Sequence, residues 1–244
     1  MSSKIKRKLI LKLALFSIVF AVIAAMLGYT GYTIGKRDIS LSASAGEVKS
    51  RKVIIDPGHG GEDGGATGIN GRLEKELNLE LSKKLDAVFA LMNVDAIMTR
   101  ESDVSLGEDA EKGKRKMTDL KRRLELAENN PDALFLSVHM NKFPQEVCHG
   151  LQIWYSPNSE NSKRLADIVR NNISTRFEIG NMRENKKASS SIYLLDRMKN
   201  TSVLIECGFI SNTDECERLC DFAYQQRLAA CIACSVLDFC SNVG

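Results

Sequence analysis

Two of the three histidines in the chain, His59 and His139, occupy equivalent positions, because each closely follows a short apolar run. A third apolar run leads directly to Glu206. Such runs are typical of strands buried in a parallel sheet, and the carboxyl ends of parallel strands meet at one edge, where ligands bind. We therefore expect the three side chains to lie near one another. The runs are residues 53–55, 134–138 and 203–205.

The residue types at this edge suit a hydrolytic zinc site, in which two imidazoles and one carboxylate bind the metal and a fourth position stays open. Glu74 is the best third ligand that the sequence offers, since it starts a helical pattern shortly after the loop that carries His59. Spacing alone leaves a second interpretation equally open, in which Glu74 is a first-turn carboxylate that stabilises the helix dipole. The third histidine, His149, is expected to be an ordinary loop residue.

The loop around His59 reads DPGHGGEDGGATG, and its glycines permit tight turns and close approach of a ligand. It lacks the Lys-Ser or Lys-Thr pair of a phosphate loop and the helix-opening context of a dinucleotide site. The sequence therefore argues against nucleotide binding at this loop.

Helical patterns separate the apolar runs. Apolar residues recur every three or four positions at 77–92, 120–127 and 165–177, and Thr118 is a candidate cap for the second helix. Strands that alternate with helices predict an α/β fold with an open, twisted, mainly parallel sheet and helices on both faces.

Charge is concentrated at the N-terminus. The chain has 244 residues and a formal charge of +3, with 43% hydrophobic and 27% charged residues, a composition that excludes a disordered chain. Residues 1–12 contain five basic residues and no acidic one, so the remainder carries a formal charge of −2. Nucleic-acid binding requires a basic face on the folded domain, and we therefore expect no nucleic acid partner.

The N-terminal residues predict a membrane anchor. Residues 13–34 contain no charged residue, and a helix of that length covers roughly 33 Å, enough to cross a bilayer core. The excess of basic residues before this segment places the N-terminus in the cytoplasm and the rest of the chain outside the cell membrane. A cleaved signal peptide is the alternative. We expect a basic segment at 1–12, a single transmembrane anchor at 13–34, a linker at 35–50 and a catalytic domain at 51–244.

Four ordered sequence blocks resemble the zinc-dependent N-acetylmuramoyl-L-alanine amidases of the amidase 3 family: VIIDPGHGGEDGGATG, GRLEKELNLELSKKL, FLSVHMN and VLIECGFISN. The resemblance covers nearly all of residues 52–239. It implies a sheet of about six strands, zinc ligands at His59, Glu74 and His139, and a catalytic glutamate at Glu206. It also implies hydrolysis of the amide between N-acetylmuramic acid and L-alanine in peptidoglycan, by a zinc-activated water with Glu206 as general base.

The short chain with a single N-terminal anchor resembles one subgroup in particular, the germination-specific amidases of spore-forming bacteria. That subgroup helps to make muramic-δ-lactam, which implies a role in the spore cortex and in germination. Two alternatives stay open: a non-catalytic wall-binding scaffold, and a zinc peptidase that cuts stem peptides. The presence of Glu206 favours an enzyme, since a scaffold has no need of a general base. A further alternative is an activating protein partner that completes the zinc site.

Other features have less specific interpretations. The charged insertion at residues 107–116 predicts a solvated loop, with a docking site for a regulatory partner as the alternative. Cys216, Cys220, Cys231 and Cys234 are expected to be small buried thiols rather than a second zinc site, and strand alternation points Cys207 into the core. Arg100 is expected to pair with Asp103 at a strand exit, and Asn141 is a candidate to support the second ligand histidine.

Overall fold

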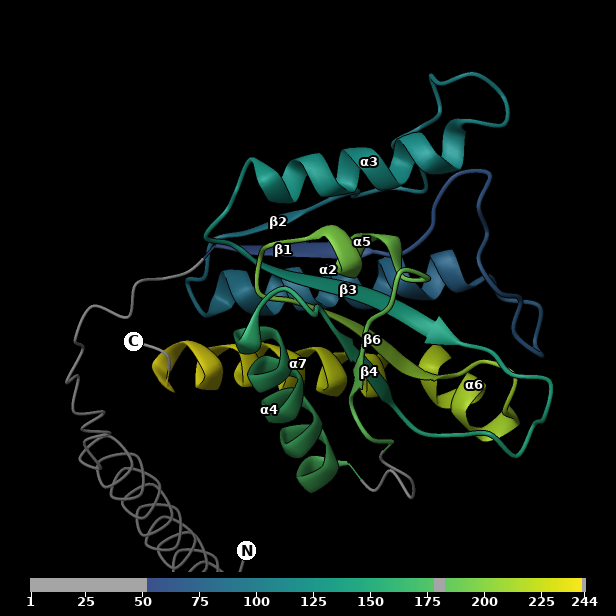
Figure 1. Cartoon of the computed structure of the whole chain (residues 1–244). Helices are drawn as coiled ribbons and strands as arrows, with labels where there is room; N and C mark the ends of the chain where they lie inside the picture. Colours follow the sequence, from purple (N-terminus) through teal and green to yellow (C-terminus); the bar gives the residue numbers. More distant parts are fainter. Residues whose placement is uncertain (1–51, 178–182, 243–244) are drawn as a thin grey trace, which may run out of the picture. The chain divides into compact units, whose positions relative to one another are not determined.

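The computed structural model describes residues 52–177 and 183–242. Strands and helices alternate along these residues and build one six-stranded sheet (Figure 1). The strands are β1 (Val53–Pro57), β2 (Ala96–Met98), β3 (Leu134–Asn141), β4 (Gln152–Tyr155), β5 (Lys186–Lys187) and β6 (Ser202–Phe209). The helices are α2 (Glu74–Leu91), α3 (Arg115–Glu128), α4 (Glu160–Arg176), α5 (Tyr193–Arg197), α6 (Thr213–Cys220) and α7 (Phe222–Asn242).

The sheet is mainly parallel, with strand order β2-β1-β3-β6-β4-β5. The three predicted apolar runs form β1, β3 and β6, which lie next to one another in the centre and pair in parallel. Among the described strands, the only antiparallel pair is β4 with β6, and β5 then pairs in parallel with β4. The predicted α/β fold with a sheet of about six strands is therefore confirmed.

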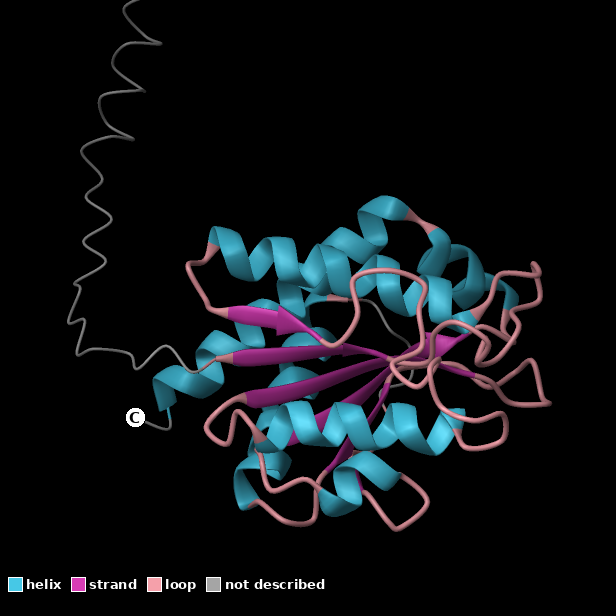
Figure 2. Cartoon of the chain, turned by 90° about the horizontal axis from the view of Figure 1, so that it is seen from above, coloured by secondary structure: helices cyan, strands magenta, loops and turns pink. Residues whose placement is uncertain are grey.

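Helices cover both faces of the sheet (Figure 2). On one face α2, α4 and α7 bury a large apolar core that includes Leu81, Val169 and Ile232. On the other face α3 and α5 bury a smaller core around Phe135 and Leu194. Both faces of β1 and β3 are thus removed from water, which explains why these strands begin as continuous apolar runs in the sequence.

Two predicted boundaries are wrong. Helix α3 begins at Arg115, and the backbone N–H of Thr118 already donates to the carbonyl of Lys114 at 2.9 Å, so Thr118 lies inside the helix and does not cap it. Strands β3 and β6 also continue past their apolar runs, because pairing between them persists through His139 and Glu206. Both of these polar residues therefore lie within strands rather than after them.

The predicted basic segment, transmembrane anchor and linker, residues 1–50, lie outside the described residues. Within 52–177 and 183–242, no helix combines the length and the apolar composition that a membrane span requires. All described elements fall within the predicted catalytic domain at 51–244.

Candidate metal centre and active site

His59 lies two residues beyond β1 in a left-handed backbone conformation, with a φ angle of 62°. This conformation is uncommon for a residue with a side chain and has an energetic cost. Arg123 of α3 donates to the carbonyl oxygens of Pro57 and His59 at 2.9 and 2.8 Å. Arg100 donates to those of Pro57 and Gly58 at 3.0 and 2.9 Å. Two buried guanidinium groups therefore hold the strained turn that presents the His59 ring.

His139 and Glu206 lie side by side, because they are register partners in the parallel pairing of β3 with β6. Their chain neighbours Val138 and Ile205 belong to the core beneath α2, α4 and α7. Since strand side chains alternate between faces, His139 and Glu206 point to the opposite face of the sheet. Cys207 belongs to the same core as Ile205, which confirms that it points away from Glu206.

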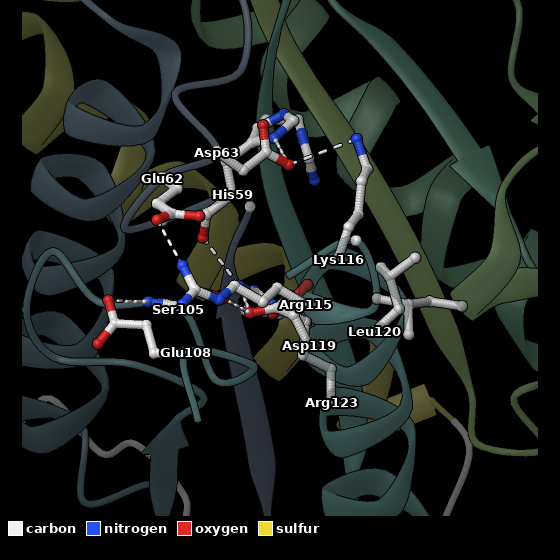
Figure 3. Close-up of a pocket in the computed structure, with 16 residues that line it drawn as sticks. His59, Glu62, Asp63, Ser105, Glu108, Arg115, Lys116, Asp119, Leu120 and Arg123 are labelled. Carbon is white, nitrogen blue, oxygen red and sulfur yellow. Dashed lines mark hydrogen bonds and ion pairs between the residues drawn. The ribbon is translucent and has the colours of Figure 1, made fainter. Parts of the chain in front are cut away.

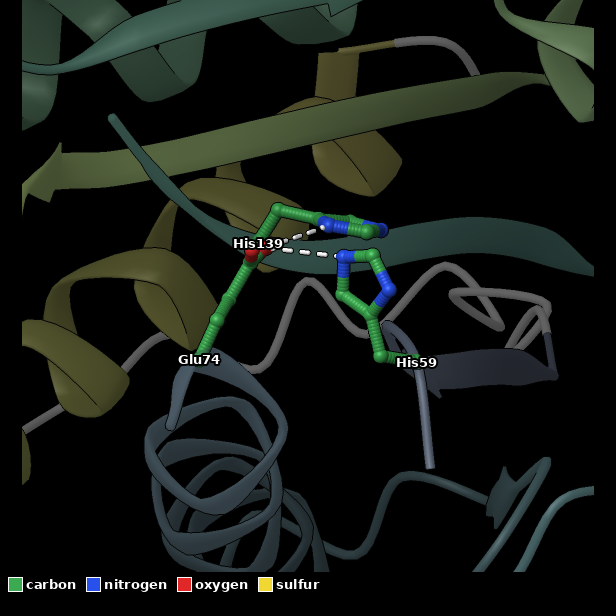
Figure 4. A group of neighbouring side chains, drawn as sticks. All are labelled: His59, Glu74 and His139. Carbon is green, nitrogen blue, oxygen red and sulfur yellow. Dashed lines mark hydrogen bonds and ion pairs between the residues drawn. The ribbon is translucent and has the colours of Figure 1, made fainter. Parts of the chain in front are cut away.

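Glu74, the first residue of α2, joins the two histidines (Figure 4). Its Oε1 lies 2.8 Å from Nδ1 of His139 and 3.2 Å from Nε2 of His59. The backbone N–H groups of Met140 and Ala66 donate to Oε1 and Oε2 at 3.2 and 2.9 Å. Glu74 does stand in the first turn of the helix, but these contacts turn its carboxylate toward the histidines. We call His59, Glu74 and His139 the His-Glu-His cluster.

The His-Glu-His cluster fits the donor set of a zinc ion. One ligand atom from each side chain lies within 4.8 Å of the others, and two imidazole nitrogens with a carboxylate oxygen are donors that zinc prefers. Oε2 of Glu206 is buried and has no hydrogen-bond partner among the described residues. An orphaned acceptor beside the cluster is what a site built for water or substrate requires.

The two carboxylates of the site have opposite pKa shifts. Burial alone would raise the pKa of Glu74, but hydrogen bonds from His139 and His59 hold it well below its usual range. Burial raises the pKa of Glu206 to about 7, a shift that the charge of His139 opposes and the charge of Glu74 supports. Glu74 is thus an anion suited to metal binding, whereas Glu206 is suited to proton exchange near neutral pH.

A cavity of about 340 Å³ opens beside the cluster (Figure 3). His59 and His139 share its walls with Glu108, Arg115 and Lys116. The last three belong to the charged insertion at 107–116, which was expected to be a solvated loop. That expectation is incomplete: Glu108 and Lys116 are exposed, but the insertion also forms part of the cavity wall.

Two further predictions about polar residues can be compared with the structure. The predicted pairing of Arg100 with Asp103 is replaced by other contacts: Asp103 pairs with Lys75 at 2.7 Å, and Arg100 binds the backbone carbonyls beyond β1. Arg100 therefore does shape a strand exit, but through the backbone. His149 is a loop histidine as predicted, with Nδ1 at 2.9 Å from the carbonyl oxygen of Val147.

The remaining predicted residues have structural contacts. The backbone carbonyl of Asn141 accepts a hydrogen bond from Ile210 at 2.8 Å and so extends the pairing of β3 with β6. No disulfide joins any two of the seven cysteines, all of which lie in the described part of the chain. The prediction of small buried thiols is confirmed for Cys216 and Cys231 and wrong for Cys220 and Cys234, which are half-buried.

The residues predicted from the sequence do not include Arg123, a buried residue that supports the turn carrying His59. Its side chain is 2% exposed and forms ion pairs with Asp56 and with Asp119, the latter at 2.6 Å. A signal was present, since Arg123 falls between Leu120 and Ala127 on the apolar stripe of its helix. An arginine at an inward-facing position requires a buried anionic or carbonyl partner.

The chain is similar to known proteins over most of its length. The sequence pattern of the N-acetylmuramoyl-L-alanine amidase family matches residues 53–238. The germination-specific N-acetylmuramoyl-L-alanine amidase of Bacillus subtilis (strain 168) is 33% identical over 199 residues, which cover 81% of this chain and 83% of that protein.

The chain is also similar to solved structures. The CwlD amidase from Clostridioides difficile, solved in complex with the GerS lipoprotein, aligns with a TM-score of 0.75 and 34% identity over 79% of this chain and 99% of that one. An N-acetylmuramoyl-L-alanine amidase from Clostridium difficile 630 aligns with a TM-score of 0.70 and 28% identity over 80% and 98% of the two chains. Because the family match extends from β1 into α7, and so includes the elements that carry the His-Glu-His cluster, the chain belongs to the N-acetylmuramoyl-L-alanine amidases, enzymes that hydrolyse peptidoglycan.

Proposed function

We propose that this amidase holds one zinc ion with His59, Glu74 and His139 and uses Glu206 as general base to hydrolyse the amide between N-acetylmuramic acid and L-alanine. The observation that carries the proposal is the convergence of two imidazoles and a carboxylate within 4.8 Å, beside a second carboxylate on the neighbouring strand. A zinc ion bound there would lower the pKa of a water and polarise the carbonyl of the amide.

Glu206 would carry the proton. Its carboxylate shares a face of the sheet with His139. One oxygen of this carboxylate, Oε2, has no hydrogen-bond partner among the described residues. It would take a proton from the attacking water and deliver it to the nitrogen of L-alanine as the carbon–nitrogen bond breaks. Protonation is required at this step because an amide anion is a poor leaving group. The reaction needs no covalent bond between enzyme and substrate.

We also propose a role in the spore cortex, in muramic-δ-lactam formation and germination. The support is the germination-specific relative from Bacillus subtilis, to which the chain is similar over most of its length. Because the similar CwlD amidase forms a complex with a lipoprotein, we propose a lipoprotein partner for this chain too. A single anchor at residues 13–34 would keep residues 51–244 on the extracytoplasmic side of the cell membrane, where peptidoglycan lies.

Mass spectrometry of muropeptides tests the reaction. Incubation of the zinc-loaded full chain with purified peptidoglycan should release intact stem peptides that begin at L-alanine. Fragments with a different N-terminus would identify a peptidase, and binding without release would identify a scaffold. Glu206→Gln should retain zinc and fold but lose hydrolysis, whereas Glu217→Gln, at an exposed position on α6, should retain activity. Wild-type turnover by Glu206→Gln would show that the assigned base is wrong.

Protease treatment of intact cells tests the topology. A protease added outside should degrade residues 51–244 and spare an epitope placed before residue 12. Protection of the whole chain would place the domain on the cytoplasmic side instead.

A further inference from the structure

The two ring nitrogens of His59 face different carboxylates. Nε2 lies 3.2 Å from Oε1 of Glu74, on the side of the His-Glu-His cluster. Nδ1 lies 3.0 Å from Oδ2 of Asp63, which is four residues further along the glycine-rich loop. Asp63 is not part of the cluster, and it contacts the ring from the side opposite to Glu74.

The carboxylate of Asp63 is itself held in place (Figure 3). Its Oδ1 accepts the backbone N–H of Gly65 at 3.1 Å, and its Oδ2 lies 3.4 Å from Nζ of Lys116. Two backbone hydrogen bonds with Gly60, at 3.0 and 3.2 Å, close the loop around His59. Both ends of the contact between Asp63 and His59 are therefore fixed by the same turn.

The chemistry of imidazole gives this contact a consequence. A neutral imidazole has one N–H group and one nitrogen with a free lone pair, and only the latter binds a metal. A carboxylate can accept a hydrogen bond but cannot donate one, so Asp63 favours the tautomer with the proton on Nδ1. That tautomer leaves Nε2 free, on the side of Glu74. Carboxylates that bind a ligand histidine in this way orient the ring and raise its basicity.

We propose that Asp63 is a positioning residue for the metal: it fixes the tautomer and the ring orientation of His59 so that Nε2 faces the ion. The assignment rests on the proposed function, because it requires that His59 bind a metal. It extends that function by giving the glycine-rich loop a role in metal affinity. It also connects the charged insertion to the site, since Lys116 contacts the same carboxylate.

The chain offers a matched control in the adjacent residue. Glu62 is also an acidic residue of this loop, but its side chain is 73% exposed and forms an ion pair with Arg115. It contacts neither of the ligand histidines in the described structure. Glu62→Gln therefore removes a charge of the same sign, one residue away, without a change at His59.

Zinc affinity of the full chain, measured by competition with a chromogenic chelator, tests the assignment. Asp63→Ala should weaken zinc binding about 10- to 100-fold. Asp63→Asn should weaken it at least as much, because its amide can donate to Nδ1 and shift the ring proton to Nε2. Glu62→Gln should bind zinc as the wild type does. The thermal midpoints of the metal-free variants should agree, which separates positioning from a loss of fold.

A spectroscopic measurement gives a second readout that a purely structural role would not change. With only three histidines in the chain, nitrogen-15 labelling of histidine resolves each ring in the zinc-loaded protein. The wild type should show a protonated Nδ1 on His59 that exchanges slowly with water, and Asp63→Ala should exchange this proton faster. If both Asp63 variants keep the zinc affinity of the wild type and the exchange rate of its Nδ1 proton, the assignment of Asp63 is wrong. The proposed function is not affected by that result. A wild-type chain that binds no zinc would overturn the proposed function, and this assignment with it.

Discussion

Replacement of Arg123 with methionine removes the cation beneath the His-Glu-His cluster while it keeps a long apolar stem. The guanidinium of Arg123 is buried between Asp56 and Asp119 and also binds the carbonyl oxygens of Pro57 and His59. Asp56 is 1% exposed, and without Arg123 the hydrogen bonds that it keeps among the described residues come from Thr99 and Ser137, at 2.8 and 2.7 Å. The variant therefore leaves a buried carboxylate without its main counter-charge.

The expected cost follows from this burial. Removal of one partner from a buried ion pair costs about 3–5 kcal/mol, because the remaining charge is uncompensated. A typical domain has an unfolding free energy of about 5–15 kcal/mol, so the loss is a large fraction of the total. At about 2–4 °C per kcal/mol for a domain of this size, the thermal midpoint of Arg123→Met should fall by about 6–20 °C.

Thermal and denaturant unfolding of the full chain measure this loss. Arg122→Met is the matched control, because Arg122 is the adjacent residue of α3 and its ion pair with Asp109 lies in solvent. We expect no measurable change for this control. Asp56→Asn combined with Arg123→Met should be more stable than Arg123→Met alone, since the stranded charge is gone. The buried pair does not hold this strand exit if Arg123→Met has the same thermal midpoint as Arg122→Met. The same conclusion follows if the addition of Asp56→Asn to Arg123→Met restores no stability.

Two further predictions concern stability in acid and the glycine that packs against the ring of His139. Burial would raise the pKa of Asp56, but the charge of Arg123 holds it below the ordinary value of 3.8. A depressed pKa stabilises the fold at pH above that value, and the contribution is lost as the pH falls from 3.8 through the lowered pKa. The unfolding free energy should therefore drop more steeply across that window in the wild type than in Asp56→Asn. A Cβ at Gly58 would lie 2.2 Å from the ring of His139, whereas one at Gly64 would be no nearer than 3.5 Å to its neighbours. Gly58→Ala should therefore lose zinc and Gly64→Ala should retain it, as metal analysis of the purified proteins will show; equal zinc contents would contradict the placement of the His139 ring.

The sequence predicts the centre of the fold well because its physical signal is local. Strands β1 and β3 are buried on both faces and β6 is buried on the face beneath α2, α4 and α7, so each contains an apolar run that stands out from its surroundings. The proximity of His139 and Glu206 follows from the parallel pairing of β3 with β6, which the structure confirms. Their roles in zinc binding and catalysis stay predictions, because geometry places groups without showing a reaction.

The side of the sheet beyond β6 and the supports of the site were not predictable in the same way. Strands β4 and β5 have four and two residues, too few for a periodic pattern, and their pairing depends on neighbours far away in the sequence. Arg123 reaches the strand exit across 64 residues, and the amide nitrogen of Asn200, with two N–H groups to donate, lies within 3.4 Å of four carbonyl oxygens around the end of α3 and the start of β3. Such contacts depend on the assembled tertiary structure, and no local rule of the sequence contains them.

The site combines three features that each oppose folding: a left-handed His59, a buried Glu74 and a buried Arg123. The fold tolerates them together because each of these residues makes a polar contact with at least one of the others. Glu74 approaches from α2 on one face of the sheet and binds both histidines, while Arg123 approaches from α3 on the other face and binds the backbone of His59. The His-Glu-His cluster is thus held by both helical layers of the domain. A substitution that shifts either layer should therefore change metal affinity as well as stability, and this coupling separates a site built into the fold from one carried on a surface loop.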